Sequence, residues 1–303
     1  MNKSTKALYF GLLALVCFIF SNGVAHADNI YVSFSPNVIL EIHPIPPITQ
    51  FASTGLSGPA GLAFNGANLY VANFSNNTIE VFNSAGHGSV FASTGLNKPV
   101  GLAFDKSGNL YVANEGNNTI EKFNSSAQGT LFASTGLAGP TGLAFDTNGN
   151  LFVANPLNDT IEKFNSNGVG TVFANLASGL NVPQGLAFDK NGNLFVSNVG
   201  VDAPNANSVV EFNSAGAGTN FASGLSQPGG LAFDSSGNLY VVETGSGRVD
   251  KIDTSGNRTP GTFLPGGTPV GIAIQVPEPA TWALVALGAA TLLGSRQSRR
   301  RSL

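Results

Sequence analysis

Four asparagines and one glutamate recur at the same point of a repeated apolar segment, where they could bind a cation or close a turn. They are Asn73, Asn114, Asn155, Asn198 and Glu243, with Phe34 at the sixth such point. Carboxylate and amide oxygens are ligands for Ca²⁺ and other hard divalent ions. Asparagine side chains also close turns by bonding nearby backbone groups. Near-identical residues in successive repeats favour this turn-closing interpretation, because catalysis usually needs one repeat to differ from the others.

Other catalytic groups are scarce. His26 precedes the repeats, while His43 and His87 fall in first-repeat and turn positions, so a histidine-ligated zinc site cannot be assembled. Cys17 is the only cysteine, and the sequence contains neither a Gly-x-Ser-x-Gly elbow nor a phosphate-binding loop. These absences favour a binding surface over an enzyme site.

A repeat sets the expected fold. Gly-Leu-Ala-Phe begins at Gly61, Gly101, Gly142, Gly185 and Gly230, and Gly271-Ile-Ala-Ile is a degenerate sixth copy. The spacing of 40 to 45 residues is the length of one four-stranded propeller blade. One unit contains four strand-like segments, at 99–104, 109–114, 119–124 and 130–134, separated by Gly, Asn, Asp and Ser. The third segment carries Glu121 and Lys122, which places it near the solvent-facing side of its blade.

The turn after the first segment is a hairpin in this scheme. Asp105-Lys-Ser-Gly108-Asn puts glycine where a positive φ is wanted, and Asp105 can bond the backbone ahead of it. An Asp-x-x-Gly-Asn segment also suggests calcium, but the hairpin accounts for it without a ligand.

The two ends of the repeat region complete one another. The last copy, Gly271–Ile274, supplies a first strand and lacks the other three. Segments 29–32, 37–42 and 49–53 match the missing second, third and fourth strands. We therefore expect an all-β, six-bladed β-propeller, in which N-terminal strands pair with the C-terminal strand and leave no exposed sheet edge at the junction.

The repeat units resemble NHL repeats, and more loosely the gluconolactonase and senescence-marker group of six-bladed propellers. Pro-x-Gly-Leu-Ala-Phe-Asp, Gly-Asn-Leu-Tyr-Val-Ala-Asn and Asn-Asn-Thr-Ile-Glu-Lys-Phe carry the resemblance, which covers about residues 29–275. The chain departs from the NHL pattern in having Asn where Asp usually ends the second strand, and Thr78, Thr119 and Thr160 where Arg usually opens the third. Arg248 keeps the basic residue. Such rings serve as lactonases, lyases and binding scaffolds.

A lactonase-like site would use Glu243, Asn155 and Asn198 as oxygen ligands of Ca²⁺ or another divalent ion, with bound water as the nucleophile. These residues lie on the presumed ligand face, which is formed by the loops between second and third strands. The longest of these loops, Val199–Asn207, is an insertion that either carries a binding function or is neutral.

The chain ends are expected to direct export. Lys3 and Lys6 precede an apolar stretch at 8–20, and Ala25-His26-Ala27 supplies a signal-peptidase site, so residues 1–27 are predicted to be a signal peptide. The alternative is a retained N-terminal anchor.

At the other end, residues 276–303 resemble a PEP-CTERM sorting signal. Pro277-Glu278-Pro279 leads into an apolar run at 280–294 and a basic cluster that includes Arg299, Arg300 and Arg301. The run is about 22 Å long as a helix, short of a hydrocarbon core of about 30 Å. The resemblance implies transient inner-membrane anchoring, processing by an exosortase and an envelope or extracellular location in a Gram-negative bacterium. An ordinary short tail anchor is the alternative.

Residues 28–275 form the expected propeller domain, and this domain is acidic. Six of the 14 basic residues and one of the 17 acidic residues lie in the two ends, which leaves 8 basic and 16 acidic residues, a net charge of −8. Such a surface repels phosphate backbones and disfavours nucleic acid. The favoured function is a non-enzymatic envelope module that binds a polysaccharide, peptide or protein without a cofactor; the alternative is a metal-dependent hydrolase of a lactone or similar ester.

The closure hypothesis predicts that removing residues 28–48 collapses the fold, because the ring then exposes an unpaired sheet edge and an apolar flank. Thermal melting monitored by circular dichroism tests this. A truncated protein with a cooperative melt near the parent temperature would contradict the closure.

Overall fold

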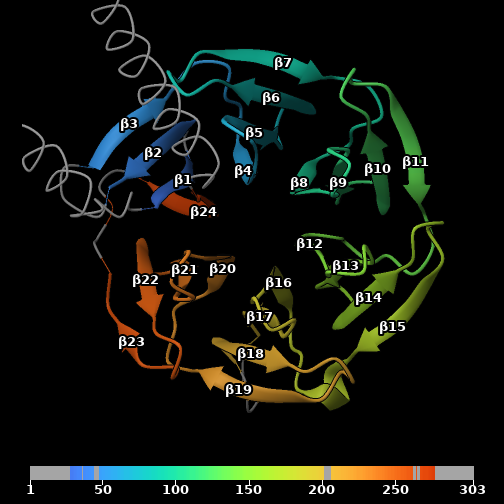
Figure 1. Ribbon diagram of the computed structural model, residues 1–303, viewed down its shortest axis with the longest axis vertical. Coiled ribbons are helices and arrows are strands. Elements are labelled where there is room, and N and C mark those ends of the chain that lie inside the picture. The colour runs from blue at the N-terminus through green and yellow to red at the C-terminus, as the bar shows by residue number, and fades with distance from the viewer. Residues whose placement is uncertain are drawn as a thin grey trace, which may run out of the picture.

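Six four-stranded antiparallel sheets surround a central axis as the blades of a propeller (Figure 1). The computed structural model describes residues 28–35, 37–43, 48–200, 206–261, 264 and 267–276. Within this part of the chain the first strand of each blade lies nearest the axis and the fourth forms the outer rim (Figure 1). The predicted all-β, six-bladed architecture is therefore confirmed.

The blades are numbered in chain order. Blade 1 contains β1 (Asn29–Ser35), β2 (Val38–Ile42), β3 (Ile48–Ala52) and β24 (Thr268–Gln275). Blade 2 contains β4 (Pro59–Asn65), β5 (Asn68–Asn73), β6 (Thr78–Phe82) and β7 (Gly88–Ala92). Blade 3 contains β8 (Pro99–Phe104), β9 (Leu110–Asn114), β10 (Thr119–Phe123) and β11 (Gly129–Ala133).

The second half of the ring follows the same order. Blade 4 contains β12 (Leu143–Phe145), β13 (Leu151–Asn155), β14 (Thr160–Phe164) and β15 (Gly170–Ala174). After a 3-10 turn at Leu176–Ser178, blade 5 contains β16 (Pro183–Phe188), β17 (Leu194–Asn198), β18 (Ser208–Phe212) and β19 (Gly218–Ala222). Blade 6 contains β20 (Pro228–Phe233), β21 (Leu239–Glu243), β22 (Arg248–Ile252) and β23 (Arg258–Thr259).

Blade 1 closes the ring with strands from both chain ends. Its sheet order is β24-β1-β2-β3, and Ile30 pairs with Ile274 while Val32 pairs with Ile272. Figure 1 shows the red β24 beside the blue β1. The predicted pairing of the first and last strands is confirmed, and it leaves no unpaired edge at the junction of β24 and β1.

Glycine lets the inner strands approach one another closely. A Cβ on Gly101 would overlap the carbonyl oxygen of Thr141 in the next blade, and a Cβ on Gly271 would overlap that of Ala60 across the closure. On Gly185 the same atom would lie 2.5 Å from the carbonyl oxygen of Gly229. The glycine is therefore required by backbone contact between blades, and not by a positive φ, at five of the six copies: Gly61, Gly101, Gly142, Gly185 and Gly271.

Aromatic side chains fill the space between neighbouring blades. Tyr111 of β9 meets Phe132 of its own blade at 4.9 Å between ring centroids, and Phe145 of blade 4 also at 4.9 Å, both edge-to-face. The same triplet recurs at four further junctions, and such pairs add about 0.5–1.5 kcal/mol each beyond area burial. Aliphatic residues around Ile272, Val242 and Leu264 pack the junction of blades 6 and 1.

Polar clasps join the blades at the turn between second and third strands. The clasp residues have positive φ, which asparagine and aspartate tolerate better than most residues. Each side-chain oxygen accepts a backbone N–H from the loop that enters the next blade. The pairs are Asn37 with Gly58, Asn77 with Lys98, Asn118 with Gly139, Asp159 with Val182, and Asn207 with Gln227.

The aspartates after the first strands close hairpins, as the sequence predicts. Asp105 Oδ1 accepts the N–H groups of Ser107 and Asn109, each at 2.9 Å. Burial opposes ionisation of Asp105, but hydrogen bonds from Asn109 and Ser107 and the nearby Lys122 charge outweigh it and lower the pKa of its carboxyl group. Backbone N–H groups thus satisfy Oδ1, and the Asn109 side-chain amide satisfies Oδ2 at 2.8 Å, so both oxygens that a calcium ion would need already have partners.

The third strands are less exposed than the sequence suggests. Glu80 and Glu162 are 5% and 6% exposed, because the loop from the preceding blade covers them. Burial raises the pKa of Glu80, Glu121 and Glu162. In blade 3, where the sequence places this strand near the solvent-facing side, Glu121 and Lys122 are of intermediate exposure.

Several predicted features lie outside the described residues. These are the signal peptide at residues 1–27, the sorting segment from Pro277 to Leu303, and the centre of the Val199–Asn207 insertion. Among the residues that the structure describes, no helix is long and apolar enough to span a membrane.

Gly101→Ala is expected to destabilise the propeller by about 2–3 kcal/mol, because the methyl group overlaps the Thr141 carbonyl and forces two inner strands apart. Urea unfolding measures the loss. Gly229→Ala is the matched control, since its Cβ meets its nearest neighbour at 3.2 Å and other blades carry larger residues there. Equal stability of the two variants would show that the glycine contacts do not limit the ring.

Candidate functional site

A hollow of about 350 Å³ opens at one end of the central axis. Its wall is built from the starts of the inner strands, where each blade contributes the residue before its invariant glycine. These six residues, here called the variable ring, are Ala60, Val100, Thr141, Gln184, Gly229 and Val270. Their position is the x of the Pro-x-Gly-Leu-Ala-Phe repeat, which was not recognised as a site from the sequence. The sequence did contain a signal for this site, because the residue type at x differs among the six blades while the residue types around it hardly change.

The side chains that line this central hollow are of kinds suited to binding a ligand. Ala60, Val100 and Val270 present apolar side chains, while Thr141 and Gln184 add a hydroxyl and an amide. Thr141 Oγ1 donates to the backbone oxygen of Gln184 at 3.2 Å. The residues that line the hollow include neither a titratable side chain nor an aromatic ring. Recognition here would rest on shape, apolar contact and backbone hydrogen bonds.

The predicted asparagines lie elsewhere, inside their own blades. Asn73, Asn114, Asn155 and Asn198 are each 0% exposed. Their Oδ1 atoms accept N–H groups of the loop entering the blade, from Ser57, Asn97, Ala138 and Asn181. Their Nδ2 atoms donate to backbone oxygens of the same loops, at Gly55, Gly95, Gly136 and Gly179. The structure thus places each asparagine as a brace between a strand end and a loop.

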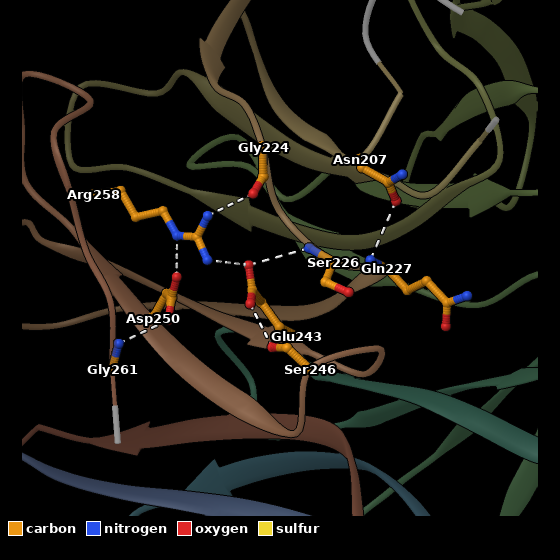
Figure 2. A network of polar contacts seen from close by, with 9 residues as sticks. All are labelled: Asn207, Gly224, Ser226, Gln227, Glu243, Ser246, Asp250, Arg258 and Gly261. Carbon is orange, nitrogen blue, oxygen red and sulfur yellow. Dashed lines mark hydrogen bonds and ion pairs between the residues drawn. The ribbon is translucent and has the colours of Figure 1, made fainter. Parts of the chain in front are cut away.

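Glu243 occupies the equivalent position in blade 6 with a different set of partners (Figure 2). Its Oε1 accepts the Ser226 N–H at 3.2 Å, as the asparagines accept theirs, and its Oε2 accepts the Ser246 hydroxyl at 2.6 Å. Arg258 Nη2 also donates to Oε1, at 2.8 Å. The Glu243 side chain is 1% exposed, so this ion pair is largely shielded from water.

Arg258 holds two buried carboxylates at once, an arrangement that the sequence analysis missed. Its Nε donates to Asp250, and its Nη1 donates to the backbone oxygen of Gly224 at 2.5 Å (Figure 2). Asp250 is 0% exposed and also accepts the Gly261 N–H at 2.8 Å. The available signal was a basic residue in the fourth strand of a blade whose second and third strands carry Glu243 and Asp250.

The predicted divalent-ion ligands do not fit a metal site. Asn155 and Asn198 brace separate blades, and both use their oxygens on backbone N–H groups. Glu243 already binds Arg258, a cation that competes with any metal ion. The described residues contain no group of three or more His, Cys, Asp or Glu side chains placed to hold a metal. In this structure the oxygens of Glu243, Asn155 and Asn198 are thus all engaged with protein groups.

Two segments of the chain match known families. Residues 96–123, which span β8 to β10, match the NHL repeat, and residues 275–301 match the PEP-CTERM protein-sorting motif. The chain is a six-bladed propeller with an NHL repeat and a PEP-CTERM sorting motif. The motif indicates export, exosortase-type processing and sorting toward the envelope of a Gram-negative bacterium. A comparison with curated protein sequences gives no match.

Solved structures share the fold of the propeller. A chain of the nidogen/laminin complex is 22% identical, with a TM-score of 0.72, over 82% of this chain and 98% of its own. The gluconolactonase XC5397 from Xanthomonas campestris is 18% identical, with a TM-score of 0.64, over 82% and 88%. An inactive virginiamycin B lyase from Staphylococcus aureus is 14% identical, with a TM-score of 0.61, over 83% and 93%. These likenesses show the architecture alone.

Arg258→Met is expected to cost about 3–5 kcal/mol at neutral pH, because Glu243 and Asp250 are then buried without their cation. Denaturant unfolding measures the cost.

The control for this prediction is Lys190→Met, which removes an exposed cation. Adding Glu243→Gln and Asp250→Asn to Arg258→Met should restore part of the loss. A deficit that is the same in the triple variant would show that Arg258 acts through packing of its stem.

Proposed function

We propose that this propeller is a non-enzymatic, exported binding module that holds a segment of a partner polypeptide at the central hollow. The sorting motif supports export and envelope-directed sorting. The hollow itself is the observation that carries the proposal, because it is concave, largely apolar and formed by residues that differ from blade to blade. A site with these properties is suited to one or two apolar side chains of a protruding loop.

Backbone groups around the hollow favour a polypeptide over a polysaccharide. Each inner strand is hydrogen-bonded to a partner strand on one side, so its other edge faces the axis (Figure 1). Backbone groups at such an edge can bond to the main chain of a peptide, which is a common mode of peptide recognition. The oxygens of Ala60, Gln184 and Gly229 already accept hydrogen bonds within the ring, and a carbonyl oxygen that accepts one bond keeps a second lone pair for a ligand. Sugars are usually bound against aromatic rings, and the lining of the hollow has none. The nidogen/laminin structure supplies a precedent for this architecture in a protein complex.

The hydrolase alternative finds less support in the geometry. Glu243, Asn155 and Asn198 are buried and hydrogen-bonded at the ends of their own strands, and none of the three lines the hollow. The gluconolactonase and lyase neighbours share the fold at low identity, and a fold of this kind hosts several activities. We therefore propose binding without catalysis and without a metal cofactor.

Selection of displayed peptides on the immobilised full-length protein tests the proposal. Peptides with apolar residues should be enriched, and Val100→Arg should weaken their binding about tenfold or more, which corresponds to about 1.4 kcal/mol. Arginine at this position places a charge in the apolar hollow. Thr130→Arg, which adds the same charge on the exposed outer strand of the same blade, is the matched control.

Two outcomes would contradict the proposal. One is peptide binding that is equal in Val100→Arg and the parent protein. The other is a melting temperature raised by Ca²⁺, lowered by EDTA and made insensitive to both by Glu243→Gln, which would support the hydrolase, because a ligand stabilises the state that binds it.

A further inference from the structure

In three blades a lysine from the third strand lies over the aromatic ring of the second strand. The same ammonium group approaches the aspartate of the hairpin after the first strand, so each lysine is bound by a ring and a carboxylate together. In blade 3, Lys122 Nζ lies 5.2 Å from the Tyr111 ring centroid and 3.9 Å from Asp105 Oδ2. In blade 4, Lys163 Nζ lies 5.3 Å from the Phe152 centroid and 4.0 Å from Asp146 Oδ2. In blade 6, Lys251 Nζ lies 5.5 Å from the Tyr240 centroid and 3.8 Å from Asp234 Oδ2.

Blade 5 keeps the ring and the aspartate but lacks the lysine. Phe195 stands at the ring position and Asp189 at the hairpin position. Glu211 is paired directly with Phe195 across the strands, which is the register that Lys163 has with Phe152 in blade 4. The replacement changes the local charge by two units, because a carboxylate stands where the neighbouring blades have an ammonium group.

A hollow of about 400 Å³ marks the place of the missing lysine. Its apolar wall contains Phe195, which meets Phe221 at 4.9 Å and Phe233 at 5.0 Å between ring centroids. Its polar wall contains Asp189 and Glu211, connected by Asn193, whose Nδ2 donates to Glu211 Oε1 at 2.9 Å. We call this site the blade 5 hollow.

We propose that the blade 5 hollow binds a primary alkylammonium group, either a lysine side chain of a partner or a free amine. An ammonium group held between a ring face and a carboxylate gains both cation–π attraction and a charge-assisted hydrogen bond. The chain itself makes this arrangement with its own lysines in blades 3, 4 and 6. The ammonium group of the ligand would thus take the position in blade 5 that a lysine side chain of the protein occupies in blades 3, 4 and 6.

The lysines at the rim of the blade 5 hollow do not take the position of the missing third-strand lysine. Lys190 lines the hollow and is exposed, and among the described residues it forms no ion pair within 4 Å. Its counterpart in blade 3, Lys106, donates to the backbone oxygen of Thr147 at 2.6 Å while Lys122 remains over Tyr111. The two lysine positions are therefore separate. Lys251 is paired with Asp234 on the far wall.

The blade 5 hollow is distinct from the central hollow. Gln184, at the start of β16, lines the central hollow, whereas Asp189 follows the end of the same strand and lines the blade 5 hollow. The two sites lie toward opposite ends of the inner strand. The ammonium site can therefore be tested without regard to peptide binding at the axis.

Calorimetric titration of the full-length protein with n-butylammonium and with Nα-acetyl-lysine methylamide tests the proposal. Glu211→Gln should weaken binding about tenfold, equivalent to about 1.4 kcal/mol. Glu211→Lys should abolish binding, because the new side chain occupies the hollow as Lys163 does in blade 4. Glu115→Gln, a change at an exposed glutamate outside the hollow, is the control and should bind as the parent protein does.

The two probes distinguish the source of the ammonium group. Binding of both supports a general alkylammonium site, and binding of the lysine derivative alone supports a partner lysine. Equal binding of neutral 1-butanol, or equal binding of n-butylammonium to the parent protein and Glu211→Lys, would overturn the proposal. Glu211→Lys is expected to melt at or above the melting temperature of the parent protein. If Glu211→Lys does not fold, the tenfold loss of binding expected for Glu211→Gln still tests the proposal.

Discussion

The structure depends on how closely the inner strands can approach around the axis. At each step the backbone of one inner strand lies against the glycine of its neighbour, with no room for a Cβ at Gly61, Gly101 or Gly142. A wider ring would separate the aromatic triplets between the blades. The glycine in each repeat therefore links local sequence to the closure of the whole ring.

Polar side chains then fix each blade relative to the next. The buried asparagines brace strand ends to entering loops, and the clasps carry a hydrogen bond from one blade to the backbone of the following one. Because the bracing asparagines are buried, replacing them would leave backbone N–H groups of the entering loops unsatisfied. Their regular recurrence follows from a structural task that is the same in every blade.

The two hollows and the buried ion pairs occur at positions where the sequence of one blade differs from that of the others. The variable ring differs from blade to blade in size and polarity and lines the central hollow. Blade 5 exchanges a lysine for Glu211 and opens a second hollow. Blade 6 replaces the bracing asparagine with Glu243, which then requires Arg258 to neutralise it. A charged residue that replaces the repeated one therefore needs a different partner, which is another side chain for Glu243 and, in our proposal, a ligand for Glu211.

The sequence by itself determined the architecture. A 40- to 45-residue period, turn residues at constant offsets and complementary chain ends predict six blades and their closure, because strand length and turn chemistry are local properties. Tertiary structure decided where the polar side chains lie. Asn155 and Asn198 were candidate ligands in the sequence and are buried braces in the fold. Arg258 meets Glu243 and Asp250 only when three strands of blade 6 pair, and the variable ring forms only when the inner strands of all six blades meet. Members of the variable ring are 40 to 45 positions apart in the chain, and even the clasps join residues 20 to 23 positions apart, so no local pattern records which side chains face one another there.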